Sequence, residues 1–196
     1  MEEKDVAPSV QSKRRLTYAD FLELPDDGMR HELIDGVHYV TPSPNLGHQE
    51  IVGRLHLALG TFLAGRRHLG RVLLSPLDVV LSDHDVVEPD PLFVARDQQD
   101  ILTRANVQGA PALVVEVLTP STRSRDQGLK RRLFDERGVR EYWLVDPEAR
   151  RVIVFRRADD GSFPQVAEPE AAGGAVLETP LVPGWTLGIA DLFSEI

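Results

Sequence analysis

One glutamate stands inside an otherwise apolar segment of this chain. Glu116 lies in the run Leu113-Val114-Val115-Glu116-Val117-Leu118, which is typical of a strand covered on both faces. An ionised carboxylate is costly to bury unless a metal ion or a cation pairs with it. Glu116 therefore requires a partner inside the fold, and the candidates are a second acid, Asp90, and a lysine, Lys130.

The two acids are suited to holding one metal ion between them. Asp90 follows Pro89 at the end of a predicted strand, 86–87. Neighbouring strands lie about 4.8 Å apart, so both carboxylates reach one ion if these strands pair. Hard oxygen ligands suit Mg²⁺ or Mn²⁺, and Mg²⁺ is usually held by one or two carboxylates with several waters. The sequence thus predicts a Mg²⁺ or Mn²⁺ site at Asp90 and Glu116.

Lys130 is the one lysine available for chemistry in the expected folded part. The other two lysines, Lys4 and Lys13, lie in a polar segment, 1–15, that we expect to be a flexible leader. At about 100° per residue, Lys130 falls inside the apolar arc of a predicted helix. Two alternatives stay open: Lys130 extends along apolar surface or pairs with Asp126, and Glu116 forms a structural ion pair with an arginine.

The predicted elements indicate an α/β domain, residues 16–196, with a mixed β-sheet flanked by helices. The strand 113–118, the helix 124–137 and the strand 141–145 form a right-handed crossover. The other predicted elements are a short helix (17–24), a hairpin (32–40), an amphipathic helix (48–63), strands (72–74, 79–81, 86–87, 92–94), a hairpin completed by 152–155, and a last strand and helix around 185–193. We expect 97–109 to be a polar connection and 159–180 to be loop-like.

Net charge, cysteine content and the length of apolar stretches limit which partners and locations we expect for this protein. The net charge of −9 counts against a general polyanion binder, although seven Lys and Arg against three Asp and Glu between residues 123 and 140 make one segment basic. The chain has no cysteine, which fits a cytoplasmic location. No apolar stretch approaches the roughly 18 residues of a membrane span, so we expect no membrane partner.

An ordered set of motifs resembles the Uma-type family of bacterial endonucleases within the PD-(D/E)XK, or restriction-endonuclease-like, superfamily. Pro89-Asp90 matches the PD, and Glu116-Val117-Leu118 matches (D/E)XK without its lysine. The further matching segments are 32–36, 48–49, 86–90, 112–122, 126–130 and 138–147. Together they cover roughly residues 17 to 157 in order, and the resemblance implies a restriction-endonuclease-like core.

The resemblance also implies roles for single residues. Asp90 and Glu116 become metal ligands, with the Val117 carbonyl as a third, and the lysine function moves from position 118 to Lys130. Glu32 is expected as a further acid at the site; the alternative is a surface position on its hairpin. For His48, the alternatives are an approach to substrate and capping of its own helix.

These expectations combine into one functional hypothesis, a Mg²⁺- or Mn²⁺-dependent endonuclease acting on DNA. Arg123, Arg125, Arg131 and Arg132 are predicted to contact the nucleic-acid backbone. The rivals are a metal-dependent hydrolase of another phosphodiester and an inert nuclease fold that serves binding or dimerisation. A homodimer is a further expectation, in which the 141–155 hairpin and the Trp185 region bury each other.

Overall fold

A six-stranded mixed sheet forms the centre of the molecule. The computed structural model describes residues 14–41 and 43–194. In spatial order the strands of this sheet are β11 (Gln165–Ala167), β10 (Arg151–Arg156), β9 (Glu141–Asp146), β8 (Leu113–Val117), β6 (Pro91–Ala95) and β3 (Gly70–Leu74). Strands β8 and β9 run parallel, and the other neighbours are antiparallel. The predicted α/β class with a mixed sheet is confirmed.

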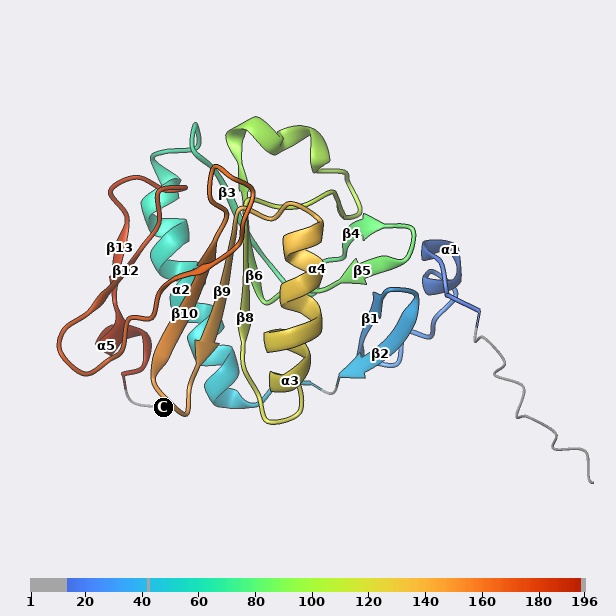
Figure 1. Ribbon diagram of the computed structural model, residues 1–196, viewed down its shortest axis with the longest axis horizontal. Coiled ribbons are helices and arrows are strands. Elements are labelled where there is room, and N and C mark those ends of the chain that lie inside the picture. Colours follow the sequence, from blue (N-terminus) through green and yellow to red (C-terminus); the bar gives the residue numbers. More distant parts are fainter. Residues whose placement is uncertain (1–13, 42, 195–196) are drawn as a thin grey trace, which may run out of the picture.

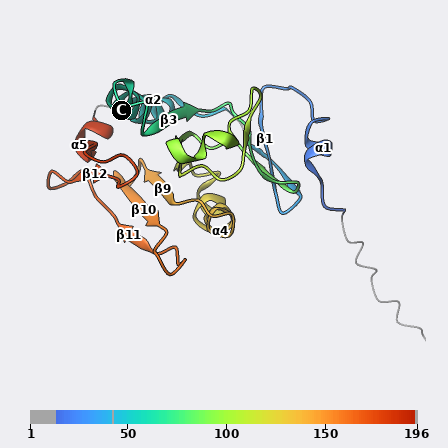
Figure 2. The same ribbon diagram turned by 90° about the horizontal axis from the view of Figure 1, so that it is seen from above.

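Helices cover both faces of this sheet. Helix α2 (Leu46–Ala64) lies on one face, and a continuous helical segment lies on the other, as Figures 1 and 2 show. That segment consists of α3 (Arg123–Arg125), the π-helical turn η2 (Asp126–Lys130) and α4 (Arg131–Glu136). Among residues 14–41 and 43–194, none of the helices combines the length and the hydrophobicity that a membrane span requires.

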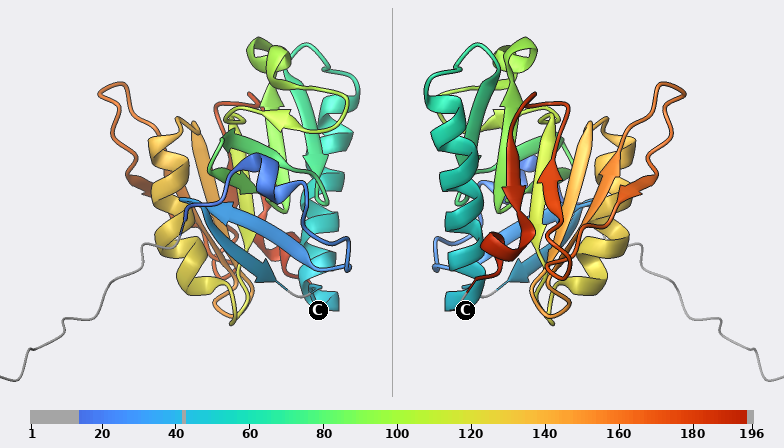
Figure 3. Two further views of the ribbon diagram at one scale, coloured as in Figure 1. Left: turned by 90° about the vertical axis from the view of Figure 1, so that its right-hand side faces the viewer. Right: turned by 90° about the vertical axis from the view of Figure 1, so that its left-hand side faces the viewer.

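The predicted strands divide between two large sheets rather than sharing one. The second sheet runs β2 (Val37–Thr41), β1 (Arg30–Ile34), β5 (Asp85–Val87), β4 (Val79–Ser82) and β7 (Val107–Gln108). It lies beside α4 and faces the viewer in the left panel of Figure 3. The remaining elements are α1 (Tyr18–Phe21), η1 (Arg96–Ile101), the strand pair β12 (Val176–Glu178) and β13 (Thr186–Gly188), and α5 (Ile189–Leu192).

Side-chain alternation along β8 separates two apolar cores. Val115 and Val117 pack in the cluster that contains the buried face of α2. Val114 and Leu118 pack in the other cluster, together with Leu133 and Phe134 of α4. Because successive side chains of a strand point to opposite faces, Glu116 belongs to the face covered by η2 and α4. Leu118, two positions after Glu116, therefore stands on the same face as Glu116.

Local sequence signals set the ends of the elements that carry the site. In the β1–β2 hairpin, Asp35 and Gly36 have φ values of 54° and 70°, the left-handed pair of a type I′ turn. Helix α2 begins at an Asn45 cap, whose side chain accepts from the His48 N–H at 2.9 Å. Helix α4 ends at Glu136, and Gly138 follows its C-cap with a φ of 83°, while the Val139 N–H donates to the Phe134 carbonyl at 3.0 Å.

Two segments contain more structure than expected. The polar connection 97–109 includes most of η1 and all of β7, and the loop-like tail 159–180 includes β11 and β12. These strands are only two or three residues long and pair at sheet margins, so they lack the periodic pattern that identifies a longer strand. The predicted leader lies outside the described residues up to residue 13. Arg14 and Arg15 pair with Asp20 and Asp35.

The 141–155 hairpin is an internal part of the central sheet. All six residues of β9 are buried, and the Trp143 ring stacks on Trp185 of the same chain with centroids 5.9 Å apart. The two regions therefore cover each other within one chain. A homodimer remains a prediction, but this surface is not free to form its interface.

Asp85 joins the second sheet to α4, and we expect its replacement to destabilise the fold in a pH-dependent way. Its carboxylate accepts from the Asp35 N–H at 2.8 Å and from Ser82 Oγ at 2.6 Å, and it pairs with Arg137. Despite the burial, which acts in the opposite direction, these hydrogen bonds lower the pKa of Asp85 below its usual value of 3.8. The stabilisation is therefore present above about pH 4 and is lost as the pH falls through the folded-state pKa.

For Asp85→Asn we expect a loss of about 1–3 kcal/mol in the free energy of unfolding near pH 7, because the charge-assisted bonds weaken. Urea denaturation near pH 7 and near pH 3 measures the effect, which should shrink at the lower pH. Asp83→Asn, at an exposed position in the same turn, is the control. An equal loss at both pH values would contradict this account of Asp85.

Candidate active site

The sheet register places Asp90 opposite Glu116. Strands β6 and β8 pair antiparallel with Leu92 against Val114, and continuing this register by two residues aligns the two acids. Asp90 Oδ2 accepts from the Val117 N–H at 2.9 Å. The strand that pairs with β8 is β6, which follows Asp90, whereas β5, the strand before it, belongs to the second sheet. The pairing that a shared metal ion requires is thus present, with Asp90 at the start of a strand rather than at the end of one.

Lys130 reaches Glu116. Its Nζ lies 2.7 Å from Glu116 Oε1 and 2.6 Å from Glu32 Oε1, and its side chain is only 1% exposed. The distance to Asp126 Oδ1 is 3.9 Å, too long for a hydrogen bond. Glu32 is itself fully buried, so it is not a surface residue of its hairpin. The amine is held between two carboxylates from different sheets, and a further N–H donor remains uncommitted to them.

A π-helical turn directs two charged side chains inward. Asp126 and Lys130 open and close the turn η2, and each is 1% exposed. Single π-turns inside α-helices occur frequently at functional sites. The Tyr142 hydroxyl donates to the Asp126 carbonyl at 3.1 Å, which fixes the start of the turn against β9. The wider turn therefore adds a fourth acid to the group formed by Glu32, Asp90 and Glu116.

Asp90 is held by three donors. Its Oδ1 accepts from Arg30 Nη2 at 2.8 Å, and its Oδ2 lies 3.0 Å from His48 Nε2 in addition to the Val117 N–H. Arg30 precedes Glu32 by two residues on β1, so both side chains leave the same face of that strand. The sequence left open whether His48 approaches substrate or caps α2. Asn45 makes the side-chain cap, and His48 orients Asp90.

The environment drives the pKa values of the two acids apart. Burial raises the pKa of Glu116 well above its usual value; the Lys130 ammonium opposes this shift, and the charge of Asp126 adds to it. Burial also acts to raise the pKa of Asp90, but the His48 hydrogen bond and the Arg30 charge outweigh it, so the pKa is lowered. The pKa of Lys130 is raised despite burial by Glu116 and Glu32. Separated carboxylate pKa values are typical of acid–base sites.

These groups open onto a cavity of about 260 Å³. Asp90, Glu116, Asp126 and Lys130 lie on its wall, and the loops 43–45 and 119–122 form its polar rim. Four buried polar atoms at this site have no hydrogen-bond partner among the described residues: Glu32 Oε2, His48 Nδ1, Arg125 Nε and Asp126 Oδ1. Buried polar groups are normally satisfied, so the cluster indicates a site shaped for a ligand.

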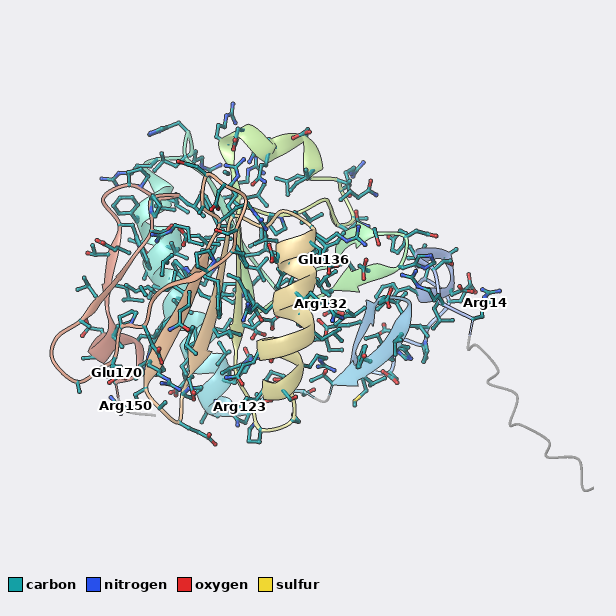
Figure 4. The ribbon with its side chains drawn as sticks, in the orientation of Figure 1. Arg14, Arg123, Arg132, Glu136, Arg150 and Glu170 are labelled. Atoms are coloured by element: carbon teal, nitrogen blue, oxygen red, sulfur yellow. The ribbon has the colours of Figure 1, made fainter. Side chains whose placement is uncertain are left out.

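The four arginines predicted to bind nucleic acid do not form one patch. Arg123 makes two bonds to Asp146, at 2.7 and 2.9 Å, and one to Glu148. Arg132 lies 3.8 Å from Glu136, and Figure 4 shows this pair on helix α4, away from Arg123 at the lower end of the helical segment. The Arg131 guanidinium lies over the Phe155 ring.

Arg125 is the member of the four that faces the site. It lines the cavity, donates to Thr41 Oγ1 at 2.6 Å, and lies 3.6 Å from Glu32 Oε2. Contacts to nucleic acid remain a prediction for all four arginines, and the geometry favours Arg125.

Comparison with known proteins places this arrangement in a family. The model of the Uma2 family, described as "Putative restriction endonuclease", matches residues 18–190. The chain belongs to the Uma2 family. An uncharacterized protein of Synechocystis sp. is 30% identical over 139 residues, which cover 68% of this chain and 70% of the relative. Membership in Uma2 supports a nuclease, as the motif resemblance implied.

The fold of this Uma2 protein also matches a solved structure. The crystal structure of a "putative nuclease belonging to DUF820" from Anabaena variabilis aligns with a TM-score of 0.74 at 22% identity. The alignment covers 91% of this chain and 98% of that one. At this identity the comparison establishes a shared fold, which agrees with the predicted restriction-endonuclease-like core.

The residues present fit a divalent ion that needs only one or two carboxylate ligands, such as Mg²⁺. Among the described residues, no group of three or more His, Cys, Asp or Glu side chains forms a ready metal cage. Mg²⁺ does not need one, since it keeps several waters. Asp90 and Glu116 supply hard oxygens beside Val117 on the same wall. Asp126 lines the same cavity, and its Oδ1 has no hydrogen-bond partner among the described residues, although Lys130 Nζ lies 3.9 Å away.

The sequence hypothesis did not assign two charged residues to the site: Arg30, and Asp126, which entered only as an alternative partner of Lys130. The predicted hairpin begins at residue 32, whereas the strand begins at Arg30. The signal for Arg30 is its i,i+2 spacing from Glu32, which places both on one face once the strand is extended to residue 30. The signal for Asp126 is its position one turn before Lys130 in the same arc of the helix. Neither signal identifies the partner, because Arg30 meets Asp90 only through the contact between the two sheets.

Proposed function

We propose that this Uma2 protein is a metal-dependent endonuclease that hydrolyses phosphodiester bonds in nucleic acid, with DNA as the first substrate to test. The observation that carries the proposal is the convergence of Asp90, Glu116 and Lys130 on one cavity wall. The Uma2 assignment supports the choice of reaction, as does the shared fold with the Anabaena protein named a "putative nuclease". The lack of cysteine fits activity in the reducing cytoplasm.

The metal would be held by Asp90 and Glu116, with the Val117 carbonyl as a third ligand. Bound Mg²⁺ or Mn²⁺ supplies Lewis-acid charge at a phosphate and lowers the pKa of water. His48 and the Val117 N–H keep the Asp90 carboxylate oriented through Oδ2. Oδ1 is bonded only by Arg30 among the described residues, so it is the oxygen that would be available to an ion.

Lys130 acts on the reacting phosphate or on the attacking water. Glu32 and Glu116 fix its amine and keep it protonated by raising its pKa. The remaining N–H donor on the cavity side either orients water or neutralises charge that develops on the phosphate. Glu32 is thus a positioning residue for Lys130. Arg125 is placed to contact the nucleic-acid backbone at the rim of the same cavity.

The decisive experiment compares wild type with Glu116→Ala. Supercoiled plasmid and single-stranded oligonucleotides are incubated with Mg²⁺, Mn²⁺ or EDTA, and products are resolved on gels. We expect cleavage by wild type in either metal, none in EDTA, and none by Glu116→Ala, because one carboxylate ligand is lost. Glu23→Ala, on an exposed turn, is the matched control and should cleave like wild type.

Two outcomes would redirect the proposal. Equal cleavage by wild type and Glu116→Ala would show that another site or a contaminant acts, and would end the assignment. Absence of both cleavage and Mn²⁺ binding by calorimetry at millimolar metal would favour the inert binding module. Hydrolysis of a small phosphodiester without nucleic-acid cleavage would favour the other rival.

A further inference from the structure

Arg30 occupies the position next to Asp90 where a cation is needed. Its Nη2 donates to Asp90 Oδ1 at 2.8 Å, and the side chain is 17% exposed. The other Asp90 oxygen, Oδ2, is already bound by Val117 N–H and His48. In the proposed reaction, the oxygen that faces a divalent ion is therefore the one that Arg30 now covers.

The guanidinium of Arg30 is only partly used by this contact. Among the described residues, the Asp90 bond is its one side-chain hydrogen bond, although a guanidinium carries several N–H donors in a planar fork. Arg30 also lines the cavity, so uncommitted donors face the space where substrate would enter. Arg123 shows the contrasting arrangement of a structural arginine, because two of its nitrogens bond both Asp146 oxygens.

The charges at the site favour the exchange of one cation for another. Four carboxylates and three cations lie together at the site: Glu32, Asp90, Glu116, Asp126, Arg30, Arg125 and Lys130. All of them except Glu32 line the cavity. Lys130 is enclosed by two acids and is fixed, and Arg125 is held at Thr41. Arg30 makes one hydrogen bond among the described residues, to Asp90, and the charges of Glu116 and Glu32 also attract it. Of the three cations it is the one bonded to Asp90, so it is the one that a divalent ion at Asp90 would displace.

We infer that Arg30 is a displaceable cation of the active site. It neutralises Asp90 while no divalent ion is bound, and an ion at Asp90 and Glu116 releases the guanidinium to bind the phosphate of the substrate. Arginine suits the second task because its planar donors match phosphate oxygens in pairs. The inference rests on the nuclease proposed above, and it adds a phosphate-binding residue to that site.

The test uses Arg30→Gln beside wild type and Arg104→Gln, a control at an exposed loop position. Mn²⁺ binding is measured by calorimetry without nucleic acid, and cleavage of one oligonucleotide is measured at saturating Mn²⁺. Removal of a competing positive charge should tighten Mn²⁺ binding about tenfold in Arg30→Gln, whereas loss of a phosphate donor should slow cleavage roughly 100-fold. Arg104→Gln should change neither quantity.

If Arg30 is a displaceable cation, its replacement tightens Mn²⁺ binding and slows cleavage. If Arg30 were only structural, its replacement would weaken Mn²⁺ binding and slow cleavage. Arg30→Lys, which keeps the charge but loses the fork, should bind Mn²⁺ within about twofold of wild type and cleave about tenfold more slowly. Mn²⁺ binding by folded Arg30→Gln that is equal to or weaker than wild type would overturn the inference, even if wild type cleaves. A third outcome is that wild type neither cleaves nor binds Mn²⁺, whereas Arg30→Gln binds Mn²⁺. This result would support displacement of Arg30 by the ion and would count only against the proposed nuclease activity.

Discussion

Replacement of Lys130 by methionine should abolish cleavage and unfold the protein far more readily. The amine lies 2.6 Å from Glu32 Oε1 and 2.7 Å from Glu116 Oε1, with its side chain 1% exposed. Without it, two carboxylates remain buried with no cation between them, a change that costs about 3–5 kcal/mol. Cleavage should fall at least about 10³-fold, since an electrostatic contact to the reacting phosphate is lost together with the orientation of Glu116. Urea denaturation and oligonucleotide cleavage measure the two effects.

A compensating variant separates stability from chemistry. In Lys130→Met combined with Glu32→Gln, one of the two stranded charges is removed, so much of the stability should return while cleavage stays absent. Arg132→Met, at an exposed position on the same helical segment, is the stability control and should remain within about 0.5 kcal/mol of wild type. If Lys130→Met were as stable as Arg132→Met, the ion pairs of Lys130 with Glu32 and Glu116 would not stabilise the fold, contrary to this prediction.

Replacement of Glu141 by alanine should be the most damaging change to the fold outside the site. Its carboxylate is 1% exposed. Oε2 accepts from the Trp143 indole at 2.9 Å, and Oε1 accepts from Arg156 Nε at 2.7 Å and Thr179 Oγ1 at 2.9 Å. Truncation leaves all three donors without this acceptor, which costs about 3–5 kcal/mol. The two tryptophans, Trp143 and Trp185, stack on each other, so fluorescence reports the unfolding directly.

A neighbouring glutamate provides the comparison for Glu141. Glu178 on β12 is exposed, and Glu178→Ala should change the free energy of unfolding by no more than about 0.5 kcal/mol. Glu141→Gln keeps the shape and one acceptor oxygen, so its loss should lie between those of the two alanine variants. Glu141 links β9 to Arg156 of β10 and to Thr179. A loss below about 1 kcal/mol in the free energy of unfolding of Glu141→Ala would show that these bonds do not stabilise the fold.

The elements with a strong local period were predictable. The alternation along β8 placed Glu116 and Leu118 on one face, and the helical arc placed Lys130 toward the interior. The Asp35-Gly36 turn and the crossover from β8 to β9 were equally clear in the sequence. Each of these features depends on neighbours in the chain, whose geometry is fixed by backbone periodicity and turn chemistry. Short edge strands such as β11 carry no such pattern, and they were missed.

The partners of the charged side chains were less predictable. Four arginines in one basic segment were predicted to contact the nucleic-acid backbone. Three of them, Arg123, Arg131 and Arg132, are engaged by Asp146, the Phe155 ring and Glu136, respectively. Net charge in a window of sequence gives no information on which charges are already paired. Only Arg125 of this group lies at the cavity.

The sequence alone determined that Glu116 must be paired inside the fold, because an isolated buried carboxylate is too costly, and that Lys130 was the lysine able to pair with it. The tertiary structure decided the rest of the site. Arg30 meets Asp90 across 60 positions of the chain, and Glu32 on β1 of the second sheet meets Lys130 on the helical turn η2. Such contacts depend on strand register and sheet packing, which many distant residues set together, so no local pattern records them.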